Sequence, residues 1–242
     1  MTSNTDSKDG IVNIYEELKT RIVKREILPD VKIKQNQIAK ELNVSRTPVI
    51  KALHMLKTEG LVDNIPNKGF FVHKASLKDT VELYELRQAV EMVAVMNTVL
   101  YAQTSDIEEL KKMFRPFIGK KNIDQTEYAE ADRYFHSRLI ELSQNSILQR
   151  TNQSILILPK AFTSGLLRSP EETLQEHINI LDALSRRDGQ QAQQYVQQHL
   201  ELTLRTLRAA MTGLRNIGVD PGKISVADAF ESNSRFENNT LS

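Results

Sequence analysis

Apolar residues recur at helical spacing in three stretches near the start of the chain. The first begins near Ile11 and ends near Pro29, the second covers about residues 35–42, and the third covers residues 46–58. In each stretch the apolar side chains lie three or four positions apart, which is the period of a helix with one buried face. The few residues between the second and third stretches leave room only for a tight turn. The pattern therefore predicts three helices, the last two joined as a helix-turn-helix.

The third predicted helix has sequence signals at both ends, and a hairpin pattern follows it. Ser45 is a natural N-cap, and Gly60 is a natural end. Two short apolar runs, residues 61–65 and 70–73, then flank a Pro-Asn-Lys-Gly turn, which predicts two antiparallel strands. Three helices followed by a hairpin make a winged helix-turn-helix, expected over residues 8–75.

From residue 77 onward the pattern is helical and contains no convincing strand. Six stretches show helical spacing, namely residues 77–103, 106–119, 124–143, 146–166, 170–187 and 189–213. Helices without a sheet bury their apolar faces against one another. The expected fold class is therefore mainly α, with the winged helix-turn-helix followed by an all-α bundle of six to seven helices over residues 77–213. Periodicity is lost over residues 214–242, which is typical of a partly disordered tail.

Composition limits both the compartment and the available chemistry. The 242-residue chain contains no cysteine, which excludes disulfides, thiolate metal sites and cysteine nucleophiles. The N-terminal segment is polar, and no apolar run reaches the roughly 18 residues that a membrane span requires. These features predict a cytoplasmic protein without a membrane partner.

The formal net charge of +1 conceals an uneven distribution. Residues 8–75 contain 13 Lys and Arg against 8 Asp and Glu, whereas residues 76–242 contain 19 against 22. A basic first third attached to a mildly acidic remainder fits a nucleic-acid-binding module joined to a domain of another kind.

The third predicted helix has the two faces that DNA reading requires. Its apolar stripe contains Val49, Ala52, Leu53 and Leu56, and the opposite face carries Arg46, Thr47, Ile50, Lys51, His54 and Lys57. A recognition helix is held by its apolar stripe while its N-terminal side chains reach base edges in the major groove. Arg46 can donate two hydrogen bonds to a guanine, and an exposed Ile50 can pack on a thymine methyl. The alternative is an amphipathic helix whose polar face is merely solvated.

Three of the five histidines fall on apolar faces of predicted helices in the second half of the chain. His136 lies four residues after Asp132, about one turn along the same helix face, and His177 and His199 lie on two later helices. Three imidazoles and one carboxylate suit Zn²⁺, Ni²⁺, Mn²⁺ or Fe²⁺ and leave coordination positions for water or a ligand. Taken singly, each histidine has the alternative of a hydrogen-bonded core residue.

The N-terminal motifs resemble the GntR family of regulators. The resemblance rests on residues 37–49 (QIAKELNVSRTPV), residues 52–62 with Glu59-Gly-Leu-Val62, and Lys68-Gly69. It implies a homodimer that binds an inverted-repeat DNA operator, with Gly69 at the tip of the wing. The candidate DNA contacts are Asn36, Ser45, Arg46, Thr47, Ile50, Lys51, Lys57, Lys68 and Gly69. Because the family usually has Arg at the position of Ile50 and an acidic residue at that of Lys51, its operator sequences do not transfer to this chain.

The C-terminal motifs are similar to the FCD effector domain of the FadR-like branch of that family. They are Asp132-Arg-Tyr-Phe-His136, Asn145-Ser-Ile-Leu148, residues 176–184 beginning Glu-His, and His199-Leu200. In metal-binding members an Asp and three His hold an ion, so the resemblance implies a divalent metal at Asp132, His136, His177 and His199. Arg87 matches an arginine that often faces the pocket, which implies a partner for an effector carboxylate. Its alternative is a salt bridge to Glu91 or Glu85.

These observations favour a dimeric transcription regulator, a repressor, whose DNA affinity is controlled by a small organic or sugar acid bound beside a divalent metal. One alternative is a metal-responsive regulator in which the ion itself is the signal. Another is a metalloenzyme, because an open site of three His and one Asp can activate water. We expect no enzyme, since no nucleophile motif accompanies the site and catalysis would not explain the winged helix.

Overall fold

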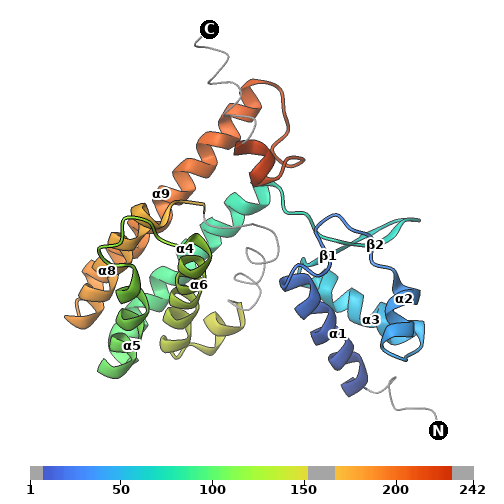
Figure 1. Ribbon diagram of the computed structural model, residues 1–242, viewed down its shortest axis with the longest axis horizontal. Helices are drawn as coiled ribbons and strands as arrows, with labels where there is room; N and C mark the ends of the chain where they lie inside the picture. The colour runs from blue at the N-terminus through green and yellow to red at the C-terminus, as the bar shows by residue number, and fades with distance from the viewer. Residues whose placement is uncertain (1–7, 152–166, 231–242) are drawn as a thin grey trace. The chain divides into compact units, whose positions relative to one another are not determined.

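The computed structural model describes residues 8–151 and 167–230. The chain divides into two compact units, of which the described parts are residues 8–74 and, for the second unit, residues 75–151 and 167–230. Each unit has its own core, and each is described by itself below (Figure 1).

The first unit is a winged helix-turn-helix, as the hydrophobic pattern predicts. Its elements are α1 (Lys8–Val23), α2 (Gln35–Glu41), α3 (Arg46–Thr58), β1 (Val62–Ile65) and β2 (Gly69–Val72). The strands pair antiparallel, with Val62 opposite Val72 and Ile65 opposite Gly69. The apolar stripe of α3 is buried against α1 and the hairpin in one cluster. This burial fixes α3 to the unit and leaves its other face exposed.

Residues with positive φ set the limits of these elements. Asn43 (φ +52°) makes the turn between α2 and α3, and Gly60 (φ +76°) ends α3. α1 ends earlier than expected, at Val23, because Arg25 (φ +60°) adopts a left-handed conformation that a right-handed helix does not accommodate. Ser45 occupies the N-cap position of α3 in extended backbone, but its side chain makes no capping hydrogen bond.

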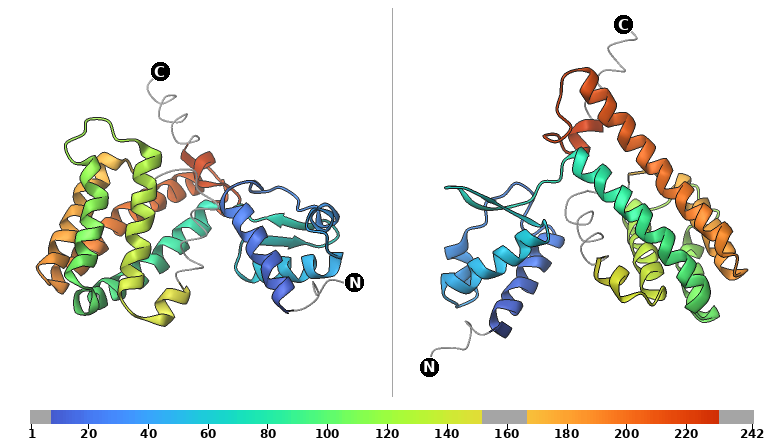
Figure 2. Two further views of the ribbon diagram at one scale, coloured as in Figure 1. Left: turned by 60° about the horizontal axis from the view of Figure 1, so that its bottom comes forward. Right: turned by 180° about the vertical axis from the view of Figure 1, so that it is seen from behind.

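The second unit is all-helical, which confirms the predicted fold class. Its elements are α4 (Leu77–Tyr101), α5 (Thr104–Phe114), the 3₁₀ helix η1 (Arg115–Phe117), α6 (Gln125–Leu142), α8 (Pro170–Ser185) and α9 (Gly189–Asn216). The long helices α4 and α9 pack side by side (Figure 2). Helices α5, α6, α8 and α9 enclose the main core with α4. The helix expected over residues 146–166 is present from residue 146 to residue 151, and its remainder lies outside the described residues.

The tail expected to be partly disordered is folded over residues 214–230. Helix α9 continues to Asn216, and the segment beyond it returns to bury Val226 and Ala229 in a cluster with Leu77 of α4. The backbone N–H of Leu77 donates to the carbonyl of Ile224 at 2.7 Å. A short segment that buries only a few apolar side chains leaves no periodic pattern in the sequence. Residues 231–242 lie outside the described part.

None of the helices in the described ranges is both long and apolar enough to cross a membrane.

Candidate metal centre and DNA-reading surface

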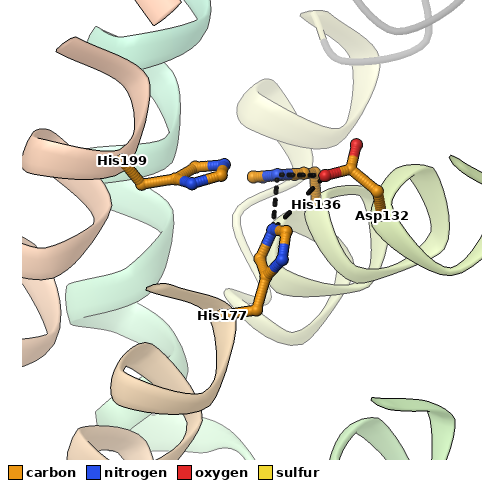
Figure 3. A group of neighbouring side chains, drawn as sticks. All are labelled: Asp132, His136, His177 and His199. Carbon is orange, nitrogen blue, oxygen red and sulfur yellow. Dashed lines mark hydrogen bonds and ion pairs between the residues drawn. The ribbon is translucent and has the colours of Figure 1, made fainter. Parts of the chain in front are cut away.

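The four predicted metal ligands converge inside the second unit (Figure 3). Asp132 and His136 come from α6, His177 comes from α8, and His199 comes from α9. Their ligand atoms all lie within 4.8 Å of one another. His177 Nε2 is 3.4 Å from His136 Nε2 and 3.4 Å from Asp132 Oδ1. Donor atoms about 3.4 Å apart suit a tetrahedral ion with bonds of about 2.1 Å, so the residues present fit a metal such as Zn²⁺.

Each of the three histidines is oriented by a hydrogen bond at its other ring nitrogen. His136 Nδ1 pairs with Glu91 Oε2 at 2.5 Å, and His199 Nδ1 pairs with Glu176 Oε2 at 2.7 Å. His177 Nδ1 lies 2.9 Å from the hydroxyl of Tyr128. Metal-binding histidines characteristically use the second nitrogen in this way, because the bond sets the tautomer and the ring orientation. The arrangement favours a shared ion site over three independent core histidines.

The outer partners are themselves held by further charged or polar groups. Glu91 also accepts from Arg87 Nε at 2.6 Å, and Glu176 accepts from both terminal nitrogens of Arg168. The Tyr128 hydroxyl accepts from Thr173 Oγ1 at 3.0 Å. The side chains around the four candidate ligands therefore form a connected network that leaves them little freedom to rotate.

Burial and neighbouring charges together determine the protonation of this cluster. Burial opposes the charge on Glu91, but the positive charges of His136 and Arg87 outweigh it and lower the pKa of that carboxyl to about 2. Burial also opposes ionisation of Asp132, and hydrogen bonding and charge from His136 lower its pKa. Burial lowers the pKa of His177 and of His199, which favours the neutral imidazole that binds metals. In His136 the two carboxylates outweigh burial and raise the pKa.

Arg87, the predicted effector ligand, is buried and ion-paired with Glu91. The structure thus has the salt bridge that the sequence left as an alternative. Of the two acidic partners considered, only Glu91 pairs with Arg87, whereas Glu85 pairs with Arg208 of α9. Through Glu91, Arg87 is connected to His136 and so to the candidate metal site.

Sequence reasoning did not identify the outer partners Glu91, Glu176 and Tyr128 as parts of the site. A local signal existed for two of them, since Glu176 directly precedes His177 and Glu91 follows Arg87 by one helical turn. The histidines that they orient, however, lie on other helices.

The structure places the predicted DNA contacts on the first unit in two groups. Four of them line one groove, namely Asn36, Arg46, Lys68 and Gly69. The other five lie outside this groove, namely Ser45, Thr47, Ile50, Lys51 and Lys57. Ile50 was expected to be exposed, but it is half-buried because it borders the buried stripe of α3. The guanidinium of Arg46 donates from Nε and Nη2 to Gln35 Oε1 at 2.9 and 2.7 Å.

Comparison with known proteins identifies both units. Residues 11–72 match the family model of bacterial regulatory proteins, gntR family, and residues 82–202 match that of the FCD domain. The Nta operon transcriptional regulator of Aminobacter aminovorans is 31% identical over 188 residues, which cover 76% of this chain and 90% of that protein. The chain belongs to the GntR family of transcriptional regulators. It is therefore a DNA-binding regulator that carries an FCD domain.

Two further comparisons support this assignment. The HTH-type transcriptional repressor RspR of Escherichia coli K12 is 26% identical over 194 residues, which cover 78% of this chain and 84% of that one. A GntR regulator of Rhodococcus sp. RHA1 shares the fold, with a TM-score of 0.68 at 23% identity over 84% of this chain and 99% of that one. Because the families and relatives are regulators and not enzymes, the metalloenzyme alternative is discarded.

Replacement of Glu91 by Ala should strongly destabilise the second unit. Glu91 is fully buried, and its loss leaves Arg87 and His136 without their shared carboxylate. Breaking a buried ion pair from one side costs about 3–5 kcal/mol of unfolding free energy. Glu85→Ala on the same helix is the matched control, since its pair with Arg208 is exposed and is worth at most about 1 kcal/mol. Denaturant unfolding measures both variants, and equal losses would contradict the role given to Glu91.

Proposed function

We propose that this GntR regulator is a homodimeric repressor that releases DNA when a small carboxylate binds beside a divalent metal in the FCD domain. The observation that carries this proposal is the buried group Asp132, His136, His177 and His199, in which every imidazole is already oriented through Nδ1. Such an arrangement supports an ion site over packing alone, because each orienting bond points a free ring edge toward the others.

The four side chains would hold Zn²⁺, Ni²⁺, Mn²⁺ or Fe²⁺, since imidazole and carboxylate donors accept any of these ions. When bound, the ion supplies a Lewis-acidic position that attracts an anionic oxygen. Arg87 lies close enough to the site for the charge of Asp132 to affect its pKa. Its guanidinium is the candidate partner for the other end of an organic or sugar acid. Binding there requires Arg87 to share or exchange its bond with Glu91.

On the DNA side, α3 would lie in the major groove with Arg46 at a guanine and Ile50 against a thymine methyl. Two copies of the chain would bind the half-sites of an inverted repeat. A ligand that binds better to one arrangement of the dimer shifts the population toward it, and by reciprocity DNA then weakens binding of that ligand. The second candidate function, in which the metal alone is the signal, rests on the same four residues.

The metal assignment is tested on protein purified without a histidine tag. Wild type should contain about one divalent ion per chain after supplementation, and the double variant His177→Ala/His199→Ala should contain none, because it removes two of the four donors. His73→Ala, which changes a histidine of the first unit, should keep the metal. Elemental analysis gives the ratio, and a double variant that retains the ion would contradict the site.

The effector proposal predicts a ligand-dependent change in both stability and DNA affinity. In a thermal-shift screen of organic and sugar acids, the acid that acts as the effector should raise the melting temperature of the protein only when no chelator is present. A ligand that binds the folded state stabilises it. The same acid should lower DNA affinity roughly 5–150-fold, the range of a typical coupling free energy. A response that survives in the double histidine variant would contradict the coupling. DNA affinity that follows the metal and ignores every acid would favour the metal-responsive alternative.

The recognition helix is tested with a duplex selected from a random library by the wild-type protein. Arg46→Ala should cost about 1–3 kcal/mol of binding free energy and remove the preference at one base position per half-site. Lys57→Ala should weaken binding to all sequences alike and reduce its salt dependence. Gel-shift titrations give the affinities, and an unchanged affinity for Arg46→Ala would show that α3 does not read the bases.

A further inference from the structure

A groove of about 360 Å³ opens where the start of α2, the start of α3 and the hairpin meet. Its lining residues are Lys32, Ile33, Lys34, Gln35, Asn36, Arg46, Asn67, Lys68 and Gly69. Four of these side chains are cationic, and none is acidic. The composition of the groove therefore suits an anion.

Some cations of the first unit are ion-paired, whereas, among the described residues, the lysines of this groove are not. Lys19 pairs with Glu59, and Arg21 pairs with both Glu17 and Glu41. By contrast, Lys32, Lys34 and Lys68 are exposed and make no ion pair with any residue of 8–151 or 167–230. Cations gathered without a carboxylate repel one another, and an anion placed among them relieves that repulsion.

A neighbouring groove provides an internal comparison. It has a similar volume, about 350 Å³, and it shares Lys32 and Lys34 with the first. Its lining also contains Glu26 and Glu41, which would repel an anion. Glu41 is paired with Arg21 of the same lining, but Glu26 still makes this side less positive than the side that Arg46 borders, so the first groove suits an anion better.

Gln35 prepares the Arg46 side of the groove. One amide oxygen accepts both hydrogen bonds from Arg46, so the guanidinium is held in place by a neutral group and keeps its full charge. Gly69 has φ +95°, a backbone conformation that other residues rarely adopt, and it lies beside Lys32 and Gln35, since a Cβ there would be 3.7 Å from Lys32 Cε and 3.9 Å from Gln35 Nε2. Gln35 is thus a positioning residue for the arginine that the proposed function assigns to base reading.

We propose that this groove receives one phosphate of the DNA backbone per half-site, contacted by Lys32 and Lys34. Neither lysine belongs to the predicted DNA contacts. The inference rests on the proposed function in one respect, because it takes Arg46 to face the bases and so puts the phosphate next to the base that Arg46 reads. Exposed lysines hold a free anion weakly, whereas a bound duplex brings its phosphates to them and releases condensed counterions.

The salt dependence of DNA binding tests the proposal in the full-length protein. Lys32→Gln and Lys34→Gln should each lower the slope of log K against log salt, on the selected duplex and on unrelated DNA alike. Together they should lower it by about 1.8 for a dimer, because each half-site loses one phosphate contact worth about 0.9. Lys40→Gln is the matched control, since Lys40 is an exposed lysine of α2 that does not line the groove. Unchanged slopes in both groove variants would overturn the proposal.

Ethylation interference gives the position of the contact. Ethylation of one particular phosphate per half-site should weaken binding of wild type and of Lys40→Gln but not of Lys32→Gln/Lys34→Gln. Gln35→Glu keeps the size and the acceptor but adds a negative charge, so it should also weaken binding and lower the slope. If ethylation weakens binding of the double lysine variant at the same phosphates as in wild type, the groove contacts none of them.

Two outcomes separate this proposal from the proposed function. If Arg46→Ala weakens DNA binding while the lysine variants leave the slope unchanged, only the groove assignment fails. If the lysine variants lower the slope while Arg46→Ala has no effect, the groove stands and the base-reading role of α3 fails. A third outcome would assign the groove to a free anion instead. In that case the lysine variants would keep the wild-type slope, and inorganic phosphate would compete with DNA better than chloride does at equal ionic strength.

Discussion

The buried carboxylate of Glu91 is the group on which the second unit depends most. It is completely inaccessible to solvent and is shared between Arg87 on its own helix and His136 on α6. A lone buried charge of this kind would be prohibitively unfavourable, so the carboxylate depends on the ion pair with Arg87 and the hydrogen bond with His136 Nδ1 to remain ionised. The result is a charged junction between α4 and α6 at the edge of the candidate metal site.

At this junction Arg87, the proposed effector residue, and His136, a proposed metal ligand, both contact the carboxylate of Glu91. A ligand that attracts Arg87 competes with Glu91 for the guanidinium and thereby alters the partner of His136. Arg87 lies on α4, the helix that follows directly on the first unit in the sequence and whose start is bonded to the segment after α9. Under the proposed function, a change at the site would be carried to the beginning of α4 along one continuous helix.

The first unit separates structural from recognition roles along α3. Its stripe from Val49 to Leu56 is buried with α1 and the hairpin, while Arg46 and Thr47 remain exposed at the start of the helix. A neighbouring polar residue contributes as well, since Gln35, eleven positions earlier in the sequence, accepts two hydrogen bonds from Arg46 and orients its guanidinium. The proposed DNA-reading surface is thus built from α2, α3 and the wing together.

Periodicity along the chain predicted both units and placed the four candidate ligands on inward helix faces, and the resemblance to the FCD domain singled them out as a metal site. Asp132 and His136 share a face because they are one turn apart, and His177 and His199 lie inward because apolar residues flank them at helical spacing. Each of these conclusions depends only on the geometry of a single helix. The motif that carries Arg46 was equally local.

Only the tertiary structure decided which partner each of these side chains has. Arg87 had two acidic neighbours on its own helix, and packing against α9 gave Glu85 to Arg208 and left Glu91 for Arg87 and His136. Residues 214–230 lost periodicity in the sequence yet are folded, because buried side chains such as Val226 and Ala229 and backbone hydrogen bonds from Leu77 and Lys78 hold them to α4. The physical reason is that helical periodicity reports the face of one element, whereas hydrogen bonds and ion pairs between elements depend on where distant segments meet in space.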